Sequence, residues 1–228
     1  MMVFLHLPTR RERTMMVELQ PMTGSYYTAD RGDVIDFLRP HGPFTQALDI
    51  GCAAGRLGGQ LREAGIVGFC DGIEPHPVAA SMAASQLRRV WRGDLTSTLS
   101  QVAWTDYDLF VLADVLEHLT DPWEALRDLH RHARSGARLM VSVPNVRHYR
   151  VILPLLFQGR FDYADAGIMD RTHLRFFTPR SLRAMLATTG WGVLTESLNI
   201  KQKYRKRWFP QRLLGEFLAV QCFVLAAK

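Results

Sequence analysis

The stretch between residues 46 and 55 has the residue types needed to hold a ligand against the protein backbone. Asp49 offers a carboxylate, and Gly51, Ala53 and Gly55 keep side-chain bulk away from a ligand that lies along the turn. A helix is expected to follow directly, and its unpaired N–H groups would attract a polar or anionic group. The pattern therefore predicts a cofactor site.

A second acidic residue, Glu74, ends the apolar run at residues 67–73. It follows the turn by roughly 20 residues, the offset at which an acidic side chain contacts ribose hydroxyls in nucleotide-binding α/β folds. We therefore expect a cofactor that contains a ribose.

Two histidines are candidates for a general base that takes a proton from a hydroxyl, because imidazole titrates near neutral pH. His118 follows an apolar run close in sequence to the expected cofactor. His173 lies near Asp170, whose carboxylate would orient the ring. The competing interpretation is structural: His118 would hydrogen-bond its loop, and the polar cluster around His173 would only pin its segment. We take His173 as the first candidate, supported by Asp170.

Strand-like apolar runs alternate with helical patterns along the chain. Helix signals are clearest at Asp121-Pro122 and Thr178-Pro179, where a capping residue precedes proline at the first helical position. This alternation predicts a Rossmann-like, doubly wound α/β fold with a mostly parallel sheet and helices on both faces. Expected strands lie near residues 47–50, 67–73, 107–113, 137–143 and 216–226, with a short one before Gly93, and expected helices near 77–87, 122–133 and 181–187.

The turn at 46–55, Glu74, the Gly93-Asp94-Leu95 string and the segment 107–122 follow one another in an order that resembles the class I S-adenosylmethionine-dependent methyltransferases of the small-molecule type 11/12 branch. The resemblance covers about residues 24–227. It implies a seven-stranded sheet with one antiparallel strand, an insert after strand five, and S-adenosylmethionine as the cofactor.

Carried over residue by residue, the resemblance implies a set of cofactor contacts. They are Asp49, Gly51, Ala53 and Gly55 at the methionine part, Glu74 at the ribose, Asp94 and Leu95 at the adenine, Asp114 at the end of strand four, and Tyr27 and Arg31 in an N-terminal cap segment. Ala53 stands where the family usually has glycine, which costs backbone freedom.

The insert at residues 144–178 is expected to choose the substrate, since a segment this long inside a compact fold is usually functional. Its strings Gly-Arg-Phe-Asp-Tyr and Asp-Arg-Thr-His-Leu-Arg-Phe-Phe-Thr resemble a subset of methyltransferases linked to bacterial glycan or polysaccharide assembly. The resemblance implies a sugar hydroxyl or another small-molecule hydroxyl as acceptor. Candidate substrate-binding residues are Asn145, Arg147, His148, Tyr149 and Arg171.

Length and cysteine content limit the other features. A chain of 228 residues fits one domain, which we place at 15–228 after a disordered extension at 1–14. Its 3 cysteines have no paired metal-ligand spacing and leave one over, so we expect neither a metal site nor a disulfide framework. These features predict a cytoplasmic protein, a monomer or homodimer, without a transmembrane segment.

A basic cluster at residues 201–207 concentrates much of the net charge of +6. The plain interpretation is a solvated surface loop. With the aromatic residues at 204, 208 and 209, the segment 201–209 could instead make peripheral contact with a membrane or bind RNA. Nucleic acid is not the expected partner.

Rival functions differ in the motifs they need. An adenine-type nucleic-acid methyltransferase would carry an Asn/Asp-Pro-Pro-aromatic motif where this chain has Ala113-Asp114-Val115-Leu116. A dinucleotide oxidoreductase would need a fuller glycine fingerprint. An RNA methyltransferase that uses the basic cluster, and a cofactor-binding protein without catalytic activity, remain the alternatives to methylation of a small-molecule or glycan hydroxyl.

Overall fold

The computed structural model of the chain describes residues 31–200 and 211–228. Tyr27, the extension at 1–14 and the basic segment 201–209 lie outside the described residues, so what was expected of them stays a prediction.

The described chain alternates strands and helices as the sequence predicted. The strands are β1 (Phe44–Ile50), β2 (Val67–Glu74), β3 (Val90–Arg92), β4 (Leu109–Ala113), β5 (Arg138–Pro144), β6 (Gly192–Ile200) and β7 (Ala219–Ala227). The α-helices are α1 (Gly32–Leu38), α2 (Arg56–Glu63), α3 (Pro77–Ala83), α4 (Leu95–Thr98), α5 (Pro122–His132), α6 (Tyr149–Gln158), α7 (Pro179–Thr188) and α8 (Gln211–Leu218). Short 3-10 helices are η2 (Arg39–His41), η3 (Trp104–Asp106) and η4 (Leu116–His118).

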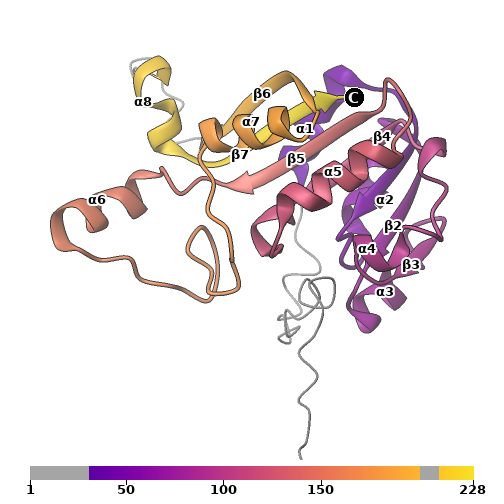
Figure 1. Ribbon diagram of the computed structural model, residues 1–228, viewed down its shortest axis with the longest axis horizontal. Helices are drawn as coiled ribbons and strands as arrows, with labels where there is room; N and C mark the ends of the chain where they lie inside the picture. The colour runs from indigo at the N-terminus through magenta and orange to yellow at the C-terminus, as the bar shows by residue number, and fades with distance from the viewer. Residues whose placement is uncertain (1–30, 201–210) are drawn as a thin grey trace, which may run out of the picture.

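The strands form one seven-stranded sheet in the order β3-β2-β1-β4-β5-β7-β6. The first five strands of that order pair in parallel, and β7 pairs antiparallel with both β5 and β6. The predicted Rossmann-like fold with one antiparallel strand is therefore confirmed (Figure 1). The chain order reverses between β1 and β4, and in such sheets ligands bind beyond the carboxyl ends of the strands at this point.

Each face of the sheet is covered by helices that bury their own hydrophobic cluster. On one face, Val34 of α1 and Leu61 of α2 pack with Ala47 and Val111 of the sheet. On the other, helices α5 and α7 pack with alternate residues of the same strands, including Leu126, Leu182, Leu48, Phe110 and Val141. Because strand side chains alternate between faces, one apolar strand serves both clusters.

The insert begins where β5 ends. Figure 1 shows α6 and the segment after it extending beyond the carboxyl end of β5, away from the sheet. Leu156 and Phe157 of α6 are 68% and 76% exposed, so this helix presents apolar side chains to its surroundings. Among the described residues, no helix has the length and apolar character needed to span a membrane.

Two expected boundaries were wrong. The last strand was expected to begin at residue 216, but residues 216–218 complete α8 and β7 begins at Ala219. The Asn145 side chain donates to the carbonyls of Glu216 and Ala219 at 2.6 and 2.9 Å, which stabilises the change from helix to strand there. The helix expected at 77–87 ends at Ala83, because the chain turns so that Leu87 packs into the core.

The buried carboxylate of Asp71 anchors β2, the strand that carries Glu74, through an ion pair with the surface residue Arg88. The Asp71 carboxylate is fully buried and accepts from Nε and Nη2 of Arg88 at 2.9 and 2.6 Å, and from the Tyr107 hydroxyl at 2.7 Å. These bonds join β2 to the segments that lead into β3 and β4.

We predict that Asp71→Asn lowers the free energy of unfolding by about 2–4 kcal/mol, because the charged bonds are lost and an amide nitrogen faces Arg88. Urea denaturation would measure the change. Arg127→Ala, which removes an exposed ion pair with Glu124, serves as control and should cost less than about 1 kcal/mol. Equal effects of the two substitutions would contradict a structural role for the buried Asp71 carboxylate.

Candidate functional site

The turn between β1 and α2 has the geometry of a close-approach site. Gly51 and Gly55 adopt left-handed backbone angles, with φ of 76° and 79°. A Cβ atom on Gly51 would lie 2.8 Å from Cγ2 of Val115. Ala53 also has a positive φ, 48°, a region that glycine adopts more easily than alanine. The expected cost of alanine at this position is therefore visible in the backbone.

Glu74 lies beside this turn at the end of β2. Its Oε2 accepts from the Ala53 N–H and its Oε1 from the His76 N–H, both at 2.8 Å. Burial raises the pKa of the Glu74 carboxyl, and the two backbone bonds oppose that shift. Each carboxylate oxygen keeps a second lone pair, which can accept from a ligand hydroxyl.

Asp49 is almost completely buried near the end of β1. Its Oδ2 has no hydrogen-bond partner among the described residues. Burial raises the pKa of Asp49 to about 7, while Arg31 favours and Glu74 disfavours the ionised form. A buried acceptor without a partner is costly, so this carboxyl is suited to a cationic or hydrogen-bonding ligand group.

Asp114 follows β4 and is held on both oxygens by protein groups. Its Oδ2 accepts from Nη1 of Arg31 at 2.8 Å and its Oδ1 from the Ser142 hydroxyl at 2.9 Å. The Gln221 amide lies 2.9 Å from each oxygen. Asp114 thus lies at the predicted edge, but its contacts bind the sheet to the cap segment. Gln221 was not singled out from the sequence, because its strand reads as uniformly apolar.

Asp94 and Leu95 lie beyond the end of β3, as expected. The Asp94 side chain accepts from the Ser97 N–H at 2.7 Å and caps α4, and Leu95 is buried in the core cluster below. The capping bond engages Oδ1, so Oδ2 can still accept from a ligand.

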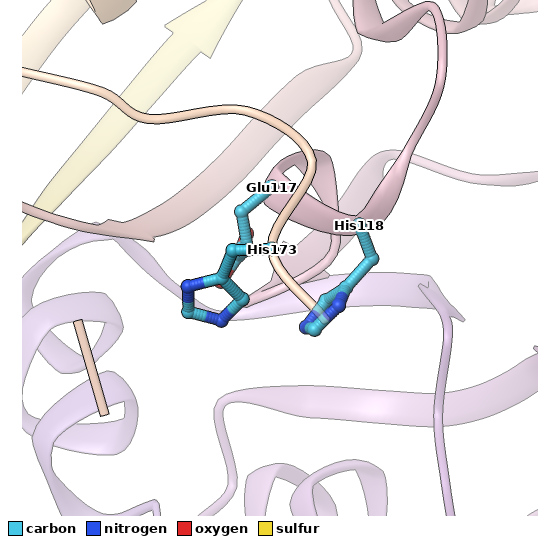
Figure 2. Close-up of side chains that lie close together, drawn as sticks. All are labelled: Glu117, His118 and His173. Atoms are coloured by element: carbon cyan, nitrogen blue, oxygen red, sulfur yellow. The ribbon is translucent and has the colours of Figure 1, made fainter. Parts of the chain in front are cut away.

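The two candidate histidines come together although 55 residues separate them in the sequence. Their ring centroids are 4.8 Å apart, with the rings nearly perpendicular. Figure 2 shows His118 and Glu117 on the short helix η4, with His173 on the insert segment that crosses it. Backbone bonds from Leu174 and Arg175 to the Glu117 carbonyl, at 2.8 and 3.0 Å, hold the insert against η4.

Burial and neighbouring groups shift the pKa values of His118 and of the adjacent Glu117. Burial and the nearby His173 lower the pKa of His118, so the His118 ring is neutral at pH 7. Glu117 is 1% exposed, and burial together with Asp114 raises the pKa of its carboxyl well above the usual range. Glu117 was not a candidate from the sequence, although it is adjacent to His118 in the chain.

The prediction that Asp170 orients His173 was wrong. The Asp170 carboxylate accepts from the N–H and hydroxyl of Thr172, at 2.8 and 2.7 Å. Thr172 in turn contacts Nδ1 of His118 through its carbonyl at 3.3 Å and its hydroxyl at 3.4 Å. Nδ1 of His173 instead lies 3.1 Å from the Ile168 carbonyl. The Asp170 carboxylate reaches the nearby Thr172 more easily than the His173 ring, whose Nδ1 is directed at the Ile168 carbonyl.

Four of the candidate substrate residues lie at the base of the insert, next to α8. Asn145 is fully buried and ties the insert to α8, and Arg147 forms an ion pair with Glu216. His148 caps α6 by accepting from the Arg150 N–H at 3.3 Å, and its ring stacks on Tyr149 with centroids 4.5 Å apart. Their observed contacts are structural and fix where the insert leaves the sheet.

A wide, open hollow of about 600 Å³ lies in front of His173. Its other lining residues are Tyr163, Arg171, Leu174 and Phe176, so Arg171 is the substrate candidate that reaches it. The Phe176 ring packs edge-on to Phe161, with centroids 5.6 Å apart, and lies 6.2 Å from the Tyr163 ring. The hollow therefore combines aromatic faces with an imidazole and a guanidinium group.

The three cysteines play no visible part in this chemistry. Cys52, Cys70 and Cys222 are buried and unpaired. Burial raises the pKa of all three thiols, so they are neutral at pH 7.

Comparison with known proteins identifies the family to which the chain is similar. Residues 25–196 match the model of a methyltransferase domain family. A relative from Aeromonas salmonicida, described as a ubiquinone biosynthesis O-methyltransferase, is 29% identical over 146 residues; the match covers 63% of this chain and 61% of the relative, so the chain spans less than two thirds of that protein.

Solved structures have the same fold. An S-adenosylmethionine-dependent methyltransferase from Archaeoglobus fulgidus superposes with a TM-score of 0.65 at 16% identity, covering 90% of this chain and 97% of that one. A possible histamine N-methyltransferase from Thermotoga maritima gives 0.62 at 15% identity, covering 85% and 86%. The matched family model spans most of the chain, including β1 to β5 and the insert. The chain therefore belongs to the methyltransferase domain family, the class I S-adenosylmethionine-dependent methyltransferases, with S-adenosylmethionine as its cofactor.

Proposed function

We propose that the protein transfers a methyl group from S-adenosylmethionine to a hydroxyl oxygen of a small-molecule or glycan acceptor held in the hollow in front of His173. The observation that carries the proposal is the pairing of His118 and His173 where the insert crosses the carboxyl edge of the sheet. The His173 imidazole thus lies beside an aromatic-lined space that can hold an acceptor.

The residues at the ends of β1 and β2 fit the cofactor. The partnerless Oδ2 of Asp49 suits the cationic amino acid end, and the second lone pairs of Glu74 suit two ribose hydroxyls. The positive φ at Gly51, where a Cβ would meet Val115, keeps the backbone open to close approach. When bound, S-adenosylmethionine supplies the methyl group and its own leaving group.

The acceptor side supports a ring-shaped hydroxyl compound. Tyr163 and Phe176 offer faces on which a sugar or aromatic ring can stack, and Arg171 can meet an anionic substituent by exchanging its exposed partner Asp165. Orientation is the main task of these residues, because methyl transfer depends on in-line approach of the two reactants. The name of the Aeromonas relative, an O-methyltransferase, favours oxygen as the atom that is methylated.

Three alternatives to methylation of a small-molecule or glycan hydroxyl remain. A nitrogen acceptor is favoured by the name of the Thermotoga structure, a possible histamine N-methyltransferase. An RNA acceptor would depend on the basic cluster at 201–207, which lies outside the described residues. A cofactor-binding protein without turnover would bind the cofactor and methylate no acceptor.

The proposal is tested by titrating the protein calorimetrically with S-adenosylmethionine, S-adenosylhomocysteine and NAD. We expect saturable binding of the first two and none of NAD. Release of S-adenosylhomocysteine is then measured with catechol, nucleotide sugars and histamine as acceptor probes. Turnover with a hydroxyl probe supports oxygen methylation, turnover with histamine alone favours the nitrogen alternative, and binding of NAD alone contradicts the proposal.

We predict that Glu74→Gln weakens S-adenosylmethionine binding by about 10- to 100-fold, because hydrogen bonds to a charged acceptor contribute about 1.5–3 kcal/mol. Calorimetry measures the dissociation constant, and circular dichroism checks that the fold is kept. Glu63→Gln, an exposed glutamate of α2, is the matched control and should bind as the wild type does. Equal affinity in both variants would remove Glu74 from the cofactor site.

We also predict that S-adenosylmethionine binds more tightly as the pH rises from 6 to 8. The pKa of Asp49 is about 7 in the free protein, and the positively charged cofactor favours the ionised carboxylate, so binding releases a proton in this range. The stability of the free protein depends on pH in the opposite direction. Because the pKa of Asp49 is higher in the folded protein than in the unfolded chain, its contribution to folding stability is fully present below a pH of about 4 and is lost as the pH rises through 7.

Calorimetry in two buffers of different ionisation enthalpy measures this proton release. Asp49→Asn should bind with little pH dependence and about tenfold more weakly at pH 8. Asp36→Asn, an exposed aspartate of α1, should keep the wild-type dependence. Proton release that persists in Asp49→Asn would assign it to another group, such as Glu74.

A further inference from the structure

The side chains of Glu117, His118 and His173 meet in one cluster. One ligand-type atom of each residue lies within 4.8 Å of those of the other two (Figure 2). The carboxylate forms no hydrogen bond or ion pair with either imidazole, so the Glu117 oxygens lie close to the two rings without bonding them. Such spacing is wider than direct hydrogen bonding and suits an intervening ion.

Glu117 supplies a second, independent observation. The residue is 1% exposed, and neither Oε1 nor Oε2 has a hydrogen-bond partner among the described residues. A buried carboxyl without partners is costly, and buried charges are normally paired or bound to a metal. Both oxygens of this side chain are therefore available to a cation.

The histidine rings are held as metal-ligating histidines usually are. Nδ1 of His118 lies 3.3 Å from the Thr172 carbonyl and Nδ1 of His173 lies 3.1 Å from the Ile168 carbonyl. A carbonyl can only accept, so each Nδ1 carries the hydrogen and each Nε2 keeps its lone pair. Backbone carbonyls that fix the tautomer in this way are typical second-shell partners of metal ligands.

We propose that Glu117, His118 and His173 bind one divalent transition-metal ion. Two imidazoles and one carboxylate suit ions of the Mn²⁺ to Zn²⁺ series, whereas Mg²⁺ and Ca²⁺ favour oxygen ligands. Ligand bonds of about 2.1 Å set neighbouring ligands about 3–3.5 Å apart, so small side-chain rotations close the cluster. No metal site was expected from the sequence, because the cysteines lack metal-ligand spacing and these three residues meet only in the fold.

The ion would also explain how the acceptor is activated, a role that rests on the proposed function. Three protein ligands leave at least one coordination position open, and His173 borders the hollow. An acceptor hydroxyl bound there loses its proton to water more easily. Its oxygen forms a bond to the methyl carbon as the bond from that carbon to sulfur breaks, and the electron pair of the broken bond stays on sulfur.

The test uses full-length protein without a polyhistidine tag, treated with EDTA and dialysed. Calorimetry with Zn²⁺, Mn²⁺, Mg²⁺ and Ca²⁺ measures affinity and stoichiometry. We expect one Zn²⁺ or Mn²⁺ per chain, weaker binding of Mg²⁺ and Ca²⁺, and a higher melting temperature with the bound ion. Glu117→Gln and His173→Asn should each weaken Zn²⁺ binding by about tenfold or more.

His132→Asn is the matched control, since this exposed histidine of α5 lies outside the cluster and should leave Zn²⁺ binding unchanged. Melting curves without metal establish that each variant folds; if His173→Asn does not, the near-isosteric Glu117→Gln carries the test. Absence of Zn²⁺ and Mn²⁺ binding, or binding that survives both cluster substitutions, overturns the site.

Titration of the EDTA-treated protein with S-adenosylmethionine separates this proposal from the proposed function. If no metal binds while cofactor binding and turnover are observed, the metal site is rejected and the proposed function stands. Metal binding without cofactor binding rejects the methyltransferase proposal and leaves the metal site in place.

Discussion

The carboxylate of Asp114 holds together the elements on which the site depends. It accepts bonds from Arg31 in the cap segment, Ser142 on β5 and Gln221 on β7, so four parts of the chain meet at one side chain. The backbone at Asp114 is left-handed, with φ of 58°, a conformation that costs free energy in a non-glycine residue. The network offsets that cost and fixes the direction in which η4 leaves the sheet.

The charge balance at the carboxyl edge of the sheet follows from this arrangement. Arg31 forms ion pairs with Asp114 and Asp33. Its charge favours the ionised forms of Asp49 and Glu117 through space, without an ion pair. Asp49 and Glu117 thus remain buried acids with unsatisfied oxygens. Such a site is incomplete without positive charge from a ligand. One acid lies at the β1 turn and the other beside the histidines; in the proposed function the first serves the cofactor position and the second the acceptor position.

The sequence predicted the fold well because its signals are local. Alternating apolar runs, the Asp121 and Thr178 caps and the turn after β1 each depend on neighbouring residues, and the structure confirms them. The start of β7 failed for the opposite reason: residues 216–218 are apolar enough for a strand, but the distant Asn145 stabilises them as the end of a helix.

The site was predicted only in part, because its contacts join distant segments. His118 and His173 were recognised by residue type. Glu117 could not be recognised in this way, because it becomes a candidate only when folding buries its carboxyl without a hydrogen-bond partner. The role assigned to Asp170 failed because its carboxylate bonds Thr172, a choice made by side-chain direction that sequence proximity does not reveal. His148, a candidate substrate ligand, caps α6, a role that depends on where α6 begins.

In the proposed function the insert serves both substrate choice and chemistry, and its attachment to the rest of the fold is compatible with both roles. Residues 174 and 175 bond the Glu117 carbonyl, and Asn145 bonds α8, so the insert is fixed at both of its ends. Between these points the chain carries α6 and the exposed loop with Phe161 and Tyr163. Sequence changes in that middle part can reshape the hollow without moving His173, because the bonds that position His173 are made by the backbone. In the proposed function this division would let acceptor specificity vary while the cluster at η4 keeps its geometry.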